Sequence, residues 1–327
     1  MRRAIAATGF AALLSFVVGS ASVGADSSRT DLKNFQHVFV IMMENTGYDQ
    51  LIGNPNAPWI NQAAQTNGLA TNYHGVTHPS QPNYLAATSG STNGIAGDAD
   101  INPPLAVPNI VDQVETSGRT WKAYMQAYAT CSTPTQSLCP SSKVGLYARK
   151  HNPFVSYADI QNNPARMANI VDFSELDADL ASGNVADYVW ITPDQCHDMH
   201  GVSGQPNCGF NQQQALIATG DAFLQDTVSK IMASPAWTGN SVIFVTWDES
   251  EFPFSDTSGC CDANPGGGHV VTLVISQSNH SPVTSGAAFN HYSMLATIQD
   301  GWNLGCLGFT CDTQNVQPMA ALTGPQG

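Results

Sequence analysis

Two pairs of residues with carboxylate or amide oxygens stand directly after apolar runs, and their side chains are suited to binding a metal ion. Glu44 and Asn45 follow the run H-V-F-V-I-M-M, and Asp248 and Glu249 follow S-V-I-F-V-T-W. Carboxylate and amide oxygens are the ligands that hard divalent cations prefer, whereas Zn²⁺ more often takes histidine or cysteine. Any one of these acids alone could cap a helix or stay solvated. Their joint placement after two predicted strands favours a metal site.

Ser80 lies in the stretch H-P-S-Q-P-N-Y-L, where a helix is expected to begin. Serine is a favoured helix cap, and Pro82 fits a first helical turn. The free amides and the dipole at a helix N-terminus also attract anions and stabilise an alkoxide, and a metal held by Glu44 and Asp248 would add to this effect. We therefore expect Ser80 to be a cap and a nucleophile. A lipase-type serine would need G-x-S-x-G, and the nearest string, G-S-T-N-G, has threonine at its centre.

Histidines gather beside acids in the string C-H-D-M-H, where His197 and His200 flank Asp198. His151 lies in a second string, K-H-N-P-F. Most single histidines lie on the surface or pack in the core, but a cluster at the end of a predicted strand is more informative. Imidazolium groups could bind a phosphoryl oxygen, and one of them could protonate a leaving group. Such a pocket favours an acidic pH optimum, because histidine is protonated near or below pH ~6.5.

The elements that must position these residues form an alternating pattern of strands and helices. Strands are predicted at 37–43, 186–191, 241–247 and 269–276, and helices at 58–66, about 81–88, 220–234 and from about 293. Near-continuous apolar strands alternating with helices predict a mostly parallel sheet with helices on both faces. Ligands bind beyond the carboxyl ends of the strands in such folds. The two acidic pairs and C-H-D-M-H all follow predicted strands, so we expect them to converge.

The first 25 residues have the layout of a secretory signal peptide. Two arginines precede a short apolar run, and the small residues Val23-Gly24-Ala25 follow it. An uncleaved membrane anchor is the alternative, but the run is short for a bilayer span. We therefore expect a secreted or periplasmic protein without stable membrane insertion. Residues 26–327 would form a single domain, with a loop-rich insertion at about 98–180.

Charge and cysteine content narrow the possible partners and the compartment. Without the two arginines of the signal peptide, nine basic residues face 25 acidic ones, a formal net charge of −16. A chain this acidic should repel nucleic acid and anionic membranes. Eight cysteines in an exported chain favour disulfides. The short loops 131–139, 196–208 and 306–311 are candidate pairs, which leaves the adjacent Cys260 and Cys261. A structural zinc site is the rival interpretation, although no C-x-x-C is present.

Six strings in order resemble the bacterial phosphoesterase family of secreted acid phosphatases and phospholipases C, within the alkaline phosphatase superfamily. They lie between about residues 36 and 300. They are H-V-F-V-I-M-M-E-N, T-H-P-S-Q-P-N-Y-L-A-A-T-S-G, K-H-N-P-F, T-P-D-Q-C-H-D-M-H, V-T-W-D-E and N-H-Y-S-M-L-A-T-I. The resemblance implies a doubly wound α/β/α sandwich and phosphoester hydrolysis through a phosphorylated serine or threonine.

The resemblance also implies roles for particular residues. Ser80 falls at the nucleophile position, and the metal ligands would be Glu44, Asn45, Ser80, Asp248 and Glu249. His151 and His200 match histidines of the phosphate pocket, and Asp198 and His197 belong to the same motif. The divalent ion could be Ca²⁺, Mg²⁺, Mn²⁺ or Zn²⁺. Many relatives have asparagine where Asp194 stands, and this extra carboxylate could hold a second metal or disfavour a phosphate dianion. Asp98 is not included in the predicted site.

Three functions remain open at the level of sequence. The first is a metal-dependent acid phosphatase, a phosphomonoesterase acting on a phosphorylated small molecule or lipid head group, in which His200 or His151 protonates the leaving group. The second is a phosphodiesterase of the phospholipase C type, in which aromatic residues such as Trp59, Tyr84, Trp190 and Phe252 could cage a quaternary ammonium. The third is a non-catalytic extracellular binding module on the same fold. The chain is short for a phospholipase C of this family, which favours the phosphatase.

Overall fold

The computed structural model describes Met1 and residues 34–128, 145–251, 254–278 and 281–324. The predicted signal peptide and the predicted pair Cys131–Cys139 lie outside the described residues. The sheet and helices belong to one compact unit, Asp31–Gly327. Within the described part of the chain, no helix is long and apolar enough to cross a membrane.

A single mixed sheet forms the centre of this unit. Its strands are β1 (Val38–Met43), β2 (Gly68–His74), β3 (Trp121–Met125), β4 (Ile170–Asp172), β5 (Tyr188–Thr192), β6 (Val242–Trp247), β7 (His269–Ser276), β8 (Val283–Ser285) and β9 (Phe289–Asn290). Their spatial order is β4-β3-β5-β1-β6-β7-β2-β8, and β9 pairs with β2. All neighbours are parallel except β7, which is antiparallel to both β6 and β2.

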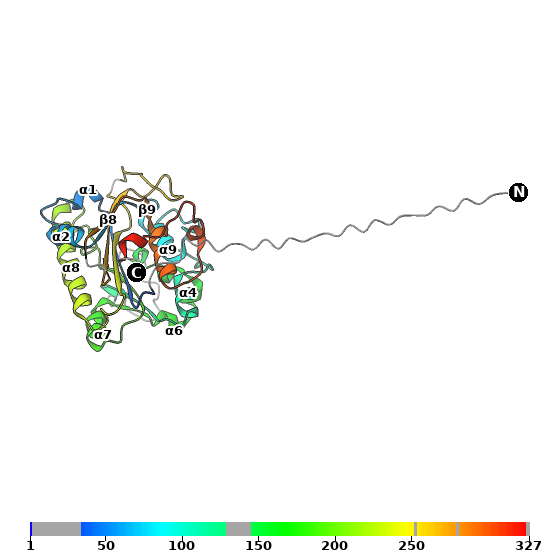
Figure 1. Cartoon of the computed structure of the whole chain (residues 1–327). Helices are drawn as coiled ribbons and strands as arrows, with labels where there is room; N and C mark the ends of the chain where they lie inside the picture. Colours follow the sequence, from blue (N-terminus) through cyan, green and yellow to red (C-terminus); the bar gives the residue numbers. More distant parts are fainter. Residues whose placement is uncertain (2–33, 129–144, 252–253, 279–280, 325–327) are drawn as a thin grey trace. The chain divides into compact units, whose positions relative to one another are not determined.

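Helices cover both faces of the sheet. They are α1 (Tyr48–Leu51), α2 (Pro58–Thr66), α3 (Ser80–Ser89), α4 (Ile110–Thr116), α5 (Ala158–Gln161), α6 (Pro164–Met167), α7 (Leu176–Ser182), α8 (Gln213–Ala233) and α9 (His291–Gly301). In Figure 1, α2 and α8 lie on one side of the strands, and α4 and α9 lie on the other. The predicted doubly wound α/β/α sandwich with a mostly parallel sheet is confirmed.

The strands at the centre of the sheet are apolar because both of their faces are covered. Every residue of β1 and of β6 is buried. β1 pairs with β5 on one side and with β6 on the other, with Met43 opposite Trp247. The parallel register aligns the carboxyl ends of β1 and β6, so the residues that follow them emerge at the same edge.

The segment at about 98–180 contains more regular structure than its sequence suggests. It supplies β3 and β4, which extend the sheet beyond β5. It also contains α4, α5 and α6, and a short 3₁₀ helix at Arg149–His151. These elements are short, which explains why hydrophobic periodicity does not reveal them.

Three disulfides join described cysteines. Cys196 pairs with Cys208 and Cys306 with Cys311, as predicted. The adjacent residues Cys260 and Cys261 are bonded to each other. No described cysteine is free, so nothing in this part of the chain supports a cysteine zinc site.

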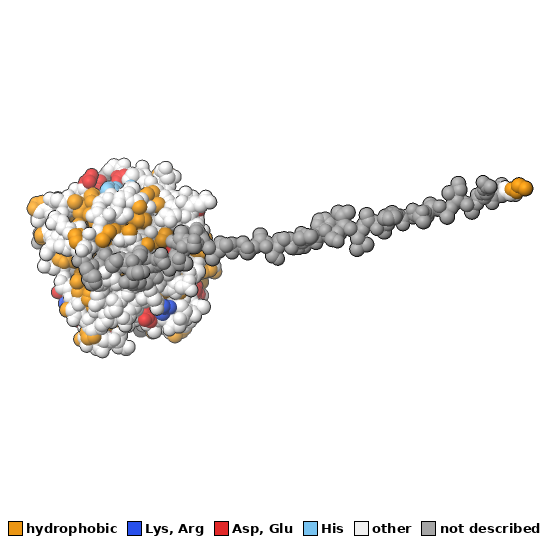
Figure 2. Space-filling model, viewed as in Figure 1, with side chains coloured by type: hydrophobic (Ala, Val, Ile, Leu, Met, Phe, Trp, Pro, Cys, Tyr) orange, Lys and Arg blue, Asp and Glu red, His pale blue; other side chains and the backbone are white. Residues whose placement is uncertain are grey.

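On the face drawn in Figure 2, the few basic side chains lie apart from one another. They form no continuous basic patch among the residues described there. Acidic side chains and a histidine lie at the upper edge of the same view. A surface of this kind offers no extended array of cations to the phosphate backbone of a nucleic acid.

Candidate active site

The hydroxyl of Ser80 lies between two carboxylates. Its Oγ is 3.0 Å from Oε2 of Glu44 and 3.0 Å from Oε1 of Glu249, and it donates its hydrogen to one of them at a time. All three residues are buried. Glu44 follows β1 and Glu249 lies two residues after β6, so the aligned ends of these parallel strands bring the two side chains together. The hydroxyl proton therefore has two acceptors within reach.

Ser80 does not cap α3. The helix begins at Ser80 itself, Pro79 occupies the cap position, and no side chain there accepts a helix amide. The predicted cap role is wrong, because Ser80 lies inside the first turn and its hydroxyl points to the glutamates instead. The preceding loop is fixed by Asn83, whose Oδ1 accepts from the amides of Val76 and Thr77 at 2.8 and 3.1 Å.

Three buried carboxylates, those of Glu44, Asp248 and Glu249, share this edge of the sheet. Burial, and next the charge of Asp248, raises the pKa of Glu44; burial, and next Glu249, raises the pKa of Asp248. Oδ1 of Asp248 accepts from the amide of Asn45 at 3.2 Å. The other oxygen of Asp248 and Oδ1 of Asn45 are buried and have no hydrogen-bond partner among the described residues.

These features fit the metal that the sequence predicts. Buried carboxylates repel one another and are costly to desolvate, and a divalent cation removes both penalties. The two unpartnered oxygens, on Asp248 and Asn45, are hard donors of the kind that Mg²⁺, Ca²⁺ and Mn²⁺ bind. The chain turns away just after β1 because Asn45 adopts a left-handed conformation with φ 43°, which asparagine tolerates better than most residues.

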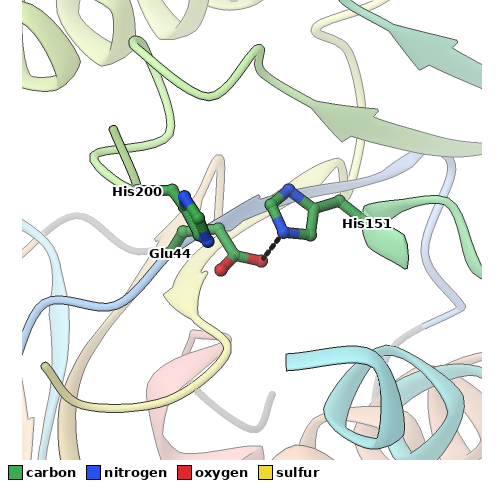
Figure 3. Close-up of side chains that lie close together, drawn as sticks. All are labelled: Glu44, His151 and His200. Atoms are coloured by element: carbon green, nitrogen blue, oxygen red, sulfur yellow. Dashed lines mark ion pairs between the residues drawn. The ribbon is translucent and has the colours of Figure 1, made fainter. Parts of the chain in front are cut away.

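A second group of possible metal ligands also includes Glu44. Glu44, His151 and His200 each offer one ligand atom, and these atoms lie within 4.8 Å of one another. Figure 3 shows the two imidazoles on either side of the Glu44 carboxylate. Nε2 of His151 is 3.1 Å from Oε1 of Glu44, although this contact lacks the angles of a hydrogen bond. Oε1 of Glu44 instead accepts from the hydroxyl of Tyr84 at 2.7 Å.

Asp198 positions the two histidines and does not reach Ser80. Its Oδ1 accepts from the backbone amide of His200 at 2.7 Å, and its Oδ2 lies 3.2 Å from Nδ1 of His151. The residue is fully buried. Its backbone carbonyl also accepts from the amide of Glu44 at 2.8 Å, which links the C-H-D-M-H loop to the end of β1.

The surroundings of His151 and His200 disfavour the charged forms of both imidazoles. Burial, and next the positive charge of Lys150, lowers the pKa of His151 and lowers that of His200 to about 4. A neutral imidazole is a metal ligand or a proton acceptor. The role of His151 and His200 as phosphate-binding imidazolium groups stays a prediction, and a lysine supplies positive charge beside them.

Lys150 is the cation of the site, and the sequence interpretation missed it. Its Nζ lies 3.4 Å from Oγ of Ser80, 3.3 Å from Nε2 of His200 and 2.9 Å from Oδ2 of Asp98. Burial disfavours the ammonium, but the nearby carboxylates, that of Glu44 foremost, outweigh burial and raise the pKa of Lys150. Its place directly before His151 in K-H-N-P-F is the signal that could have identified it.

His197 and Asp194 lie apart from this group. Nδ1 of His197 is 3.0 Å from Oδ1 of Asp194, and the same oxygen accepts from the amides of Cys196 and His197. The ring of His197 packs on Phe223, and about a third of its side chain is exposed. The described contacts of His197 and Asp194 do not include Ser80 or a carboxylate of the metal site, so the catalytic role predicted for His197 is not supported. Asp194 organises the turn and pairs with His197.

Of three further histidines, two contact the carboxylates of the site or their backbone, and the third lies outside it. Nδ1 of His78 contacts Oε2 of Glu249, and its Nε2 lies 2.9 Å from the carbonyl of Asp256. Nε2 of His291 contacts the carbonyl oxygen of Asp248 at 2.6 Å. His269 stacks on Tyr48 and bonds through Nε2 to a backbone carbonyl. His78 and His291 therefore hold the carboxylates or their backbone in place.

Of the aromatic residues considered for a quaternary-ammonium cage, the three that the structure describes do not form one. Tyr84 and Trp190 are fully buried and pack against each other in the core. Trp59 lies on α2, where it lines a cavity of about 270 Å³ with residues of α8. Phe252 lies outside the described residues. The described site offers carboxylates, imidazoles and one ammonium rather than aromatic faces.

Comparisons with known proteins identify the family to which the chain belongs. Residues 54–305 match the phosphoesterase family. The chain is 28% identical to a probable acid phosphatase of Kluyveromyces lactis over 296 residues, which cover 88% of this chain and 63% of that protein. It is also 28% identical to a phosphatidylinositol-3-phosphatase of Mycobacterium tuberculosis, over 98% of this chain and 94% of that protein. The chain thus spans less than two thirds of the yeast relative and nearly all of the mycobacterial one.

A solved structure shares the fold. It is a protein of the alkaline phosphatase superfamily from Vibrio parahaemolyticus, with a TM-score of 0.54 and 12% sequence identity. The match covers 86% of this chain and 71% of that one. This similarity concerns the fold, a mostly parallel sheet between layers of helices. The chain belongs to the phosphoesterase family.

Proposed function

We propose that this protein is a secreted, metal-dependent phosphomonoesterase of the acid phosphatase type that works through a phosphoserine intermediate. The observation that carries the proposal is the position of Ser80 Oγ, 3.0 Å from both Glu44 and Glu249 and 3.4 Å from Nζ of Lys150. A nucleophilic oxygen needs proton acceptors and nearby positive charge. The relatives named acid phosphatase and phosphatidylinositol-3-phosphatase support hydrolysis of phosphomonoesters.

In the first half of the reaction, Ser80 Oγ attacks phosphorus and its proton passes to a neighbouring carboxylate. The Oγ–P bond forms as the bond from phosphorus to the leaving alcohol oxygen breaks, and that oxygen takes up the proton from the carboxylate and leaves as an alcohol. The ammonium of Lys150 stabilises the negative charge of the transferring group. In the second half, water attacks the phosphoserine, phosphate leaves, and the serine hydroxyl is restored.

The metal would be held by Glu44, Asn45, Ser80, Asp248 and Glu249, or by Glu44 together with His151 and His200. The first set is all oxygen and suits Mg²⁺, Ca²⁺ or Mn²⁺, whereas the second contains two imidazoles and suits Zn²⁺. When bound, a divalent cation supplies positive charge that favours the ionised serine and the phosphoryl oxygens. Asp198 would fix the orientation of the imidazoles of the second set.

The substrate we propose is a phosphorylated small molecule or a phosphorylated lipid head group. The lipid alternative is favoured by the mycobacterial relative, which this chain matches over nearly its whole length. A phospholipase C-type diesterase is less well supported, since no aromatic cage is present among the described residues of the site. Release of diacylglycerol from phosphatidylcholine vesicles would establish the diesterase in its place.

Secretion is supported by the three disulfides among the described residues, because such bonds form and persist in oxidising compartments. Fractionation of cells that produce the full-length chain would test this part of the proposal. Recovery of the protein in the reduced cytosolic fraction only would contradict it.

The decisive experiment is hydrolysis of an aryl phosphate by the purified, metal-loaded protein. We expect Ser80→Ala to lower kcat by at least about 10³-fold, because the covalent route is lost. Ser89→Ala is the matched control. It removes a buried hydroxyl from the carboxyl end of the same helix, where its partners include Leu85, Ser91 and Asn93.

Three outcomes would count against the proposal. Wild-type turnover in Ser80→Ala would rule out the phosphoserine route. Full activity after treatment with EDTA and gel filtration would rule out metal dependence. Binding of phosphate without any turnover of aryl phosphates or vesicle lipids would instead indicate a non-catalytic binding module.

A further inference from the structure

The carboxylate of Asp98 accepts hydrogen bonds from two donors that lie beside Ser80. Its Oδ1 accepts from the backbone amide of Gln81 at 3.0 Å, and its Oδ2 accepts from Nζ of Lys150 at 2.9 Å. Gln81 is the second residue of α3 and directly follows Ser80. Nζ of Lys150 is itself 3.4 Å from Oγ of Ser80.

A phosphoryl group transferring to Ser80 would use these same two donors. An amide in the first turn of a helix is a natural partner for a phosphoryl oxygen, and an ammonium forms strong charge-assisted bonds to it. In the structure the carboxylate of Asp98 already accepts from both the amide of Gln81 and the ammonium of Lys150. Asp98 is about one third exposed, so its side chain has solvent on one side.

We propose, on the basis of the function proposed above, that Asp98 determines specificity by competing with the substrate for the amide of Gln81 and the ammonium of Lys150. The carboxylate repels a bound anion in proportion to the charge of that anion. A phosphoryl group with two negative charges is therefore disfavoured more than one with a single charge. The substrate class that results is the singly charged phosphoryl group.

This selection suits hydrolysis in acid. A phosphomonoester loses its second proton with a pKa of ~6, so below that pH it carries a single negative charge. Free phosphate formed as product would also be held weakly once it becomes a dianion, which favours its release. The preference for a singly charged phosphoryl group depends on the charge of the ligand and on the carboxylate of Asp98, and it requires no change of fold.

Asp100 provides a matched control in the same segment. Asp100 also forms an ion pair, here with Arg149, the residue directly before Lys150. Nη1 of Arg149 lies 3.3 Å from Oδ1 of Asp100. Its described contacts do not include Ser80, Gln81 or Lys150. Asp100→Asn therefore removes the same charge and one ion pair without freeing the two donors.

The test compares two anions by calorimetric titration of the metal-loaded protein at pH 8.5. Inorganic phosphate is largely a dianion at this pH, and dimethyl phosphate is a stable monoanion. We expect Asp98→Asn to tighten the binding of phosphate about tenfold and that of dimethyl phosphate only about threefold, since the repulsion scales with charge. Asp100→Asn should leave both affinities within twofold of the wild-type values.

Equal gains for both anions, no gain, or weaker phosphate binding in Asp98→Asn would overturn the proposal, as would failure of either anion to bind any of the proteins. If Asp98→Asn does not fold, as judged by circular dichroism, Asp98→Ala is measured in its place and should show the same ratio. Calorimetry needs no turnover. A protein without phosphatase activity would therefore refute the proposed function, while these titrations would still decide the role of Asp98.

Discussion

At the scale of single residues, the site is defined by what surrounds the hydroxyl of Ser80. The acids beside it were identifiable because each follows an apolar strand, and a strand end fixes where the next side chain emerges. Lys150 and Asp98 were not identifiable in this way. Asp98 comes from a loop and Lys150 from a short 3₁₀ helix, and neither follows a strand whose end would fix its position. The motif histidines were identified by type, but their charge depends on burial and on Lys150.

The two histidines of C-H-D-M-H allow a matched prediction at this scale. We expect His200→Ala to lower metal affinity on the order of 10–100-fold, with a parallel loss of kcat/KM, because the imidazole of His200 lies beside Glu44 and His151. His197→Ala should leave both within about twofold, since His197 contacts Asp194 and Phe223.

Metal content by mass spectrometry and turnover of an aryl phosphate would measure the two histidine variants. Equal losses in the two variants would show that the whole loop, and not His200 alone, supports the site. A loss confined to His197→Ala would contradict the arrangement of side chains described here.

At the scale of elements, the strongly apolar segments were predictable and the short ones were not. The predicted bounds of 58–66 and 269–276 coincide with α2 and β7, and the predicted 241–247 lies within one residue of β6. β2 was missed because its sequence, G-L-A-T-N-Y-H, is not a continuous apolar run. The direction of β7 could not be predicted either, because an apolar strand reads the same whichever way it runs.

Helix α3, which carries Ser80, is anchored at its other end by a close contact between backbones. Gly90 ends the helix with φ 71°, and its carbonyl accepts from the amide of Phe309 at 2.8 Å. A Cβ on Gly90 would lie 2.0 Å from the carbonyl oxygen of Leu307, in the loop closed by the disulfide of Cys306. The end of α3 and this loop therefore need glycine at the point where they meet.

Two glycine substitutions separate the cost of the left-handed backbone at Gly90 from the cost of the clash with Leu307. Gly94→Ala should lower the free energy of unfolding by about 1–2 kcal/mol, since Gly94 has φ 76° and nothing lies within 4 Å of its added Cβ. Gly90→Ala carries the same backbone penalty and also the clash with Leu307, so its loss should be clearly larger. Chemical denaturation of both variants would measure the difference, and equal losses would show that the loop yields without cost.

At the scale of the whole molecule, the metal site should couple to stability. Three buried carboxylates gather at one edge of the sheet, and a cation that binds only the folded chain stabilises it by mass action. For the EDTA-treated protein, we expect added divalent cation at 100 times its Kd to stabilise the fold by about 2.7 kcal/mol. The rise in Tm would be followed by calorimetry.

Two aspartate variants serve to locate that effect. Asp248→Asn should reduce the metal-induced rise in Tm, because Asp248 supplies an unpartnered buried oxygen. Asp187→Asn should keep it, since Asp187 bonds to Thr120 at the opposite, amino end of β5. A metal-induced rise that is the same in both variants would place the ion elsewhere.

The order of the strands has a consequence for how the protein is made. β1 is an early strand in the chain but lies inside the sheet, and its two partners, β5 and β6, come much later in the sequence. At a synthesis rate of ~5–20 residues per second, the roughly 200 residues between β1 and the end of β6 take about 10–40 seconds to appear. Until β5 has appeared, the apolar strand V-F-V-I-M-M has no partner and is exposed to aggregation. Glu44 and Glu249 meet only at the end of this delay, so the group of carboxylates around Ser80 is assembled late.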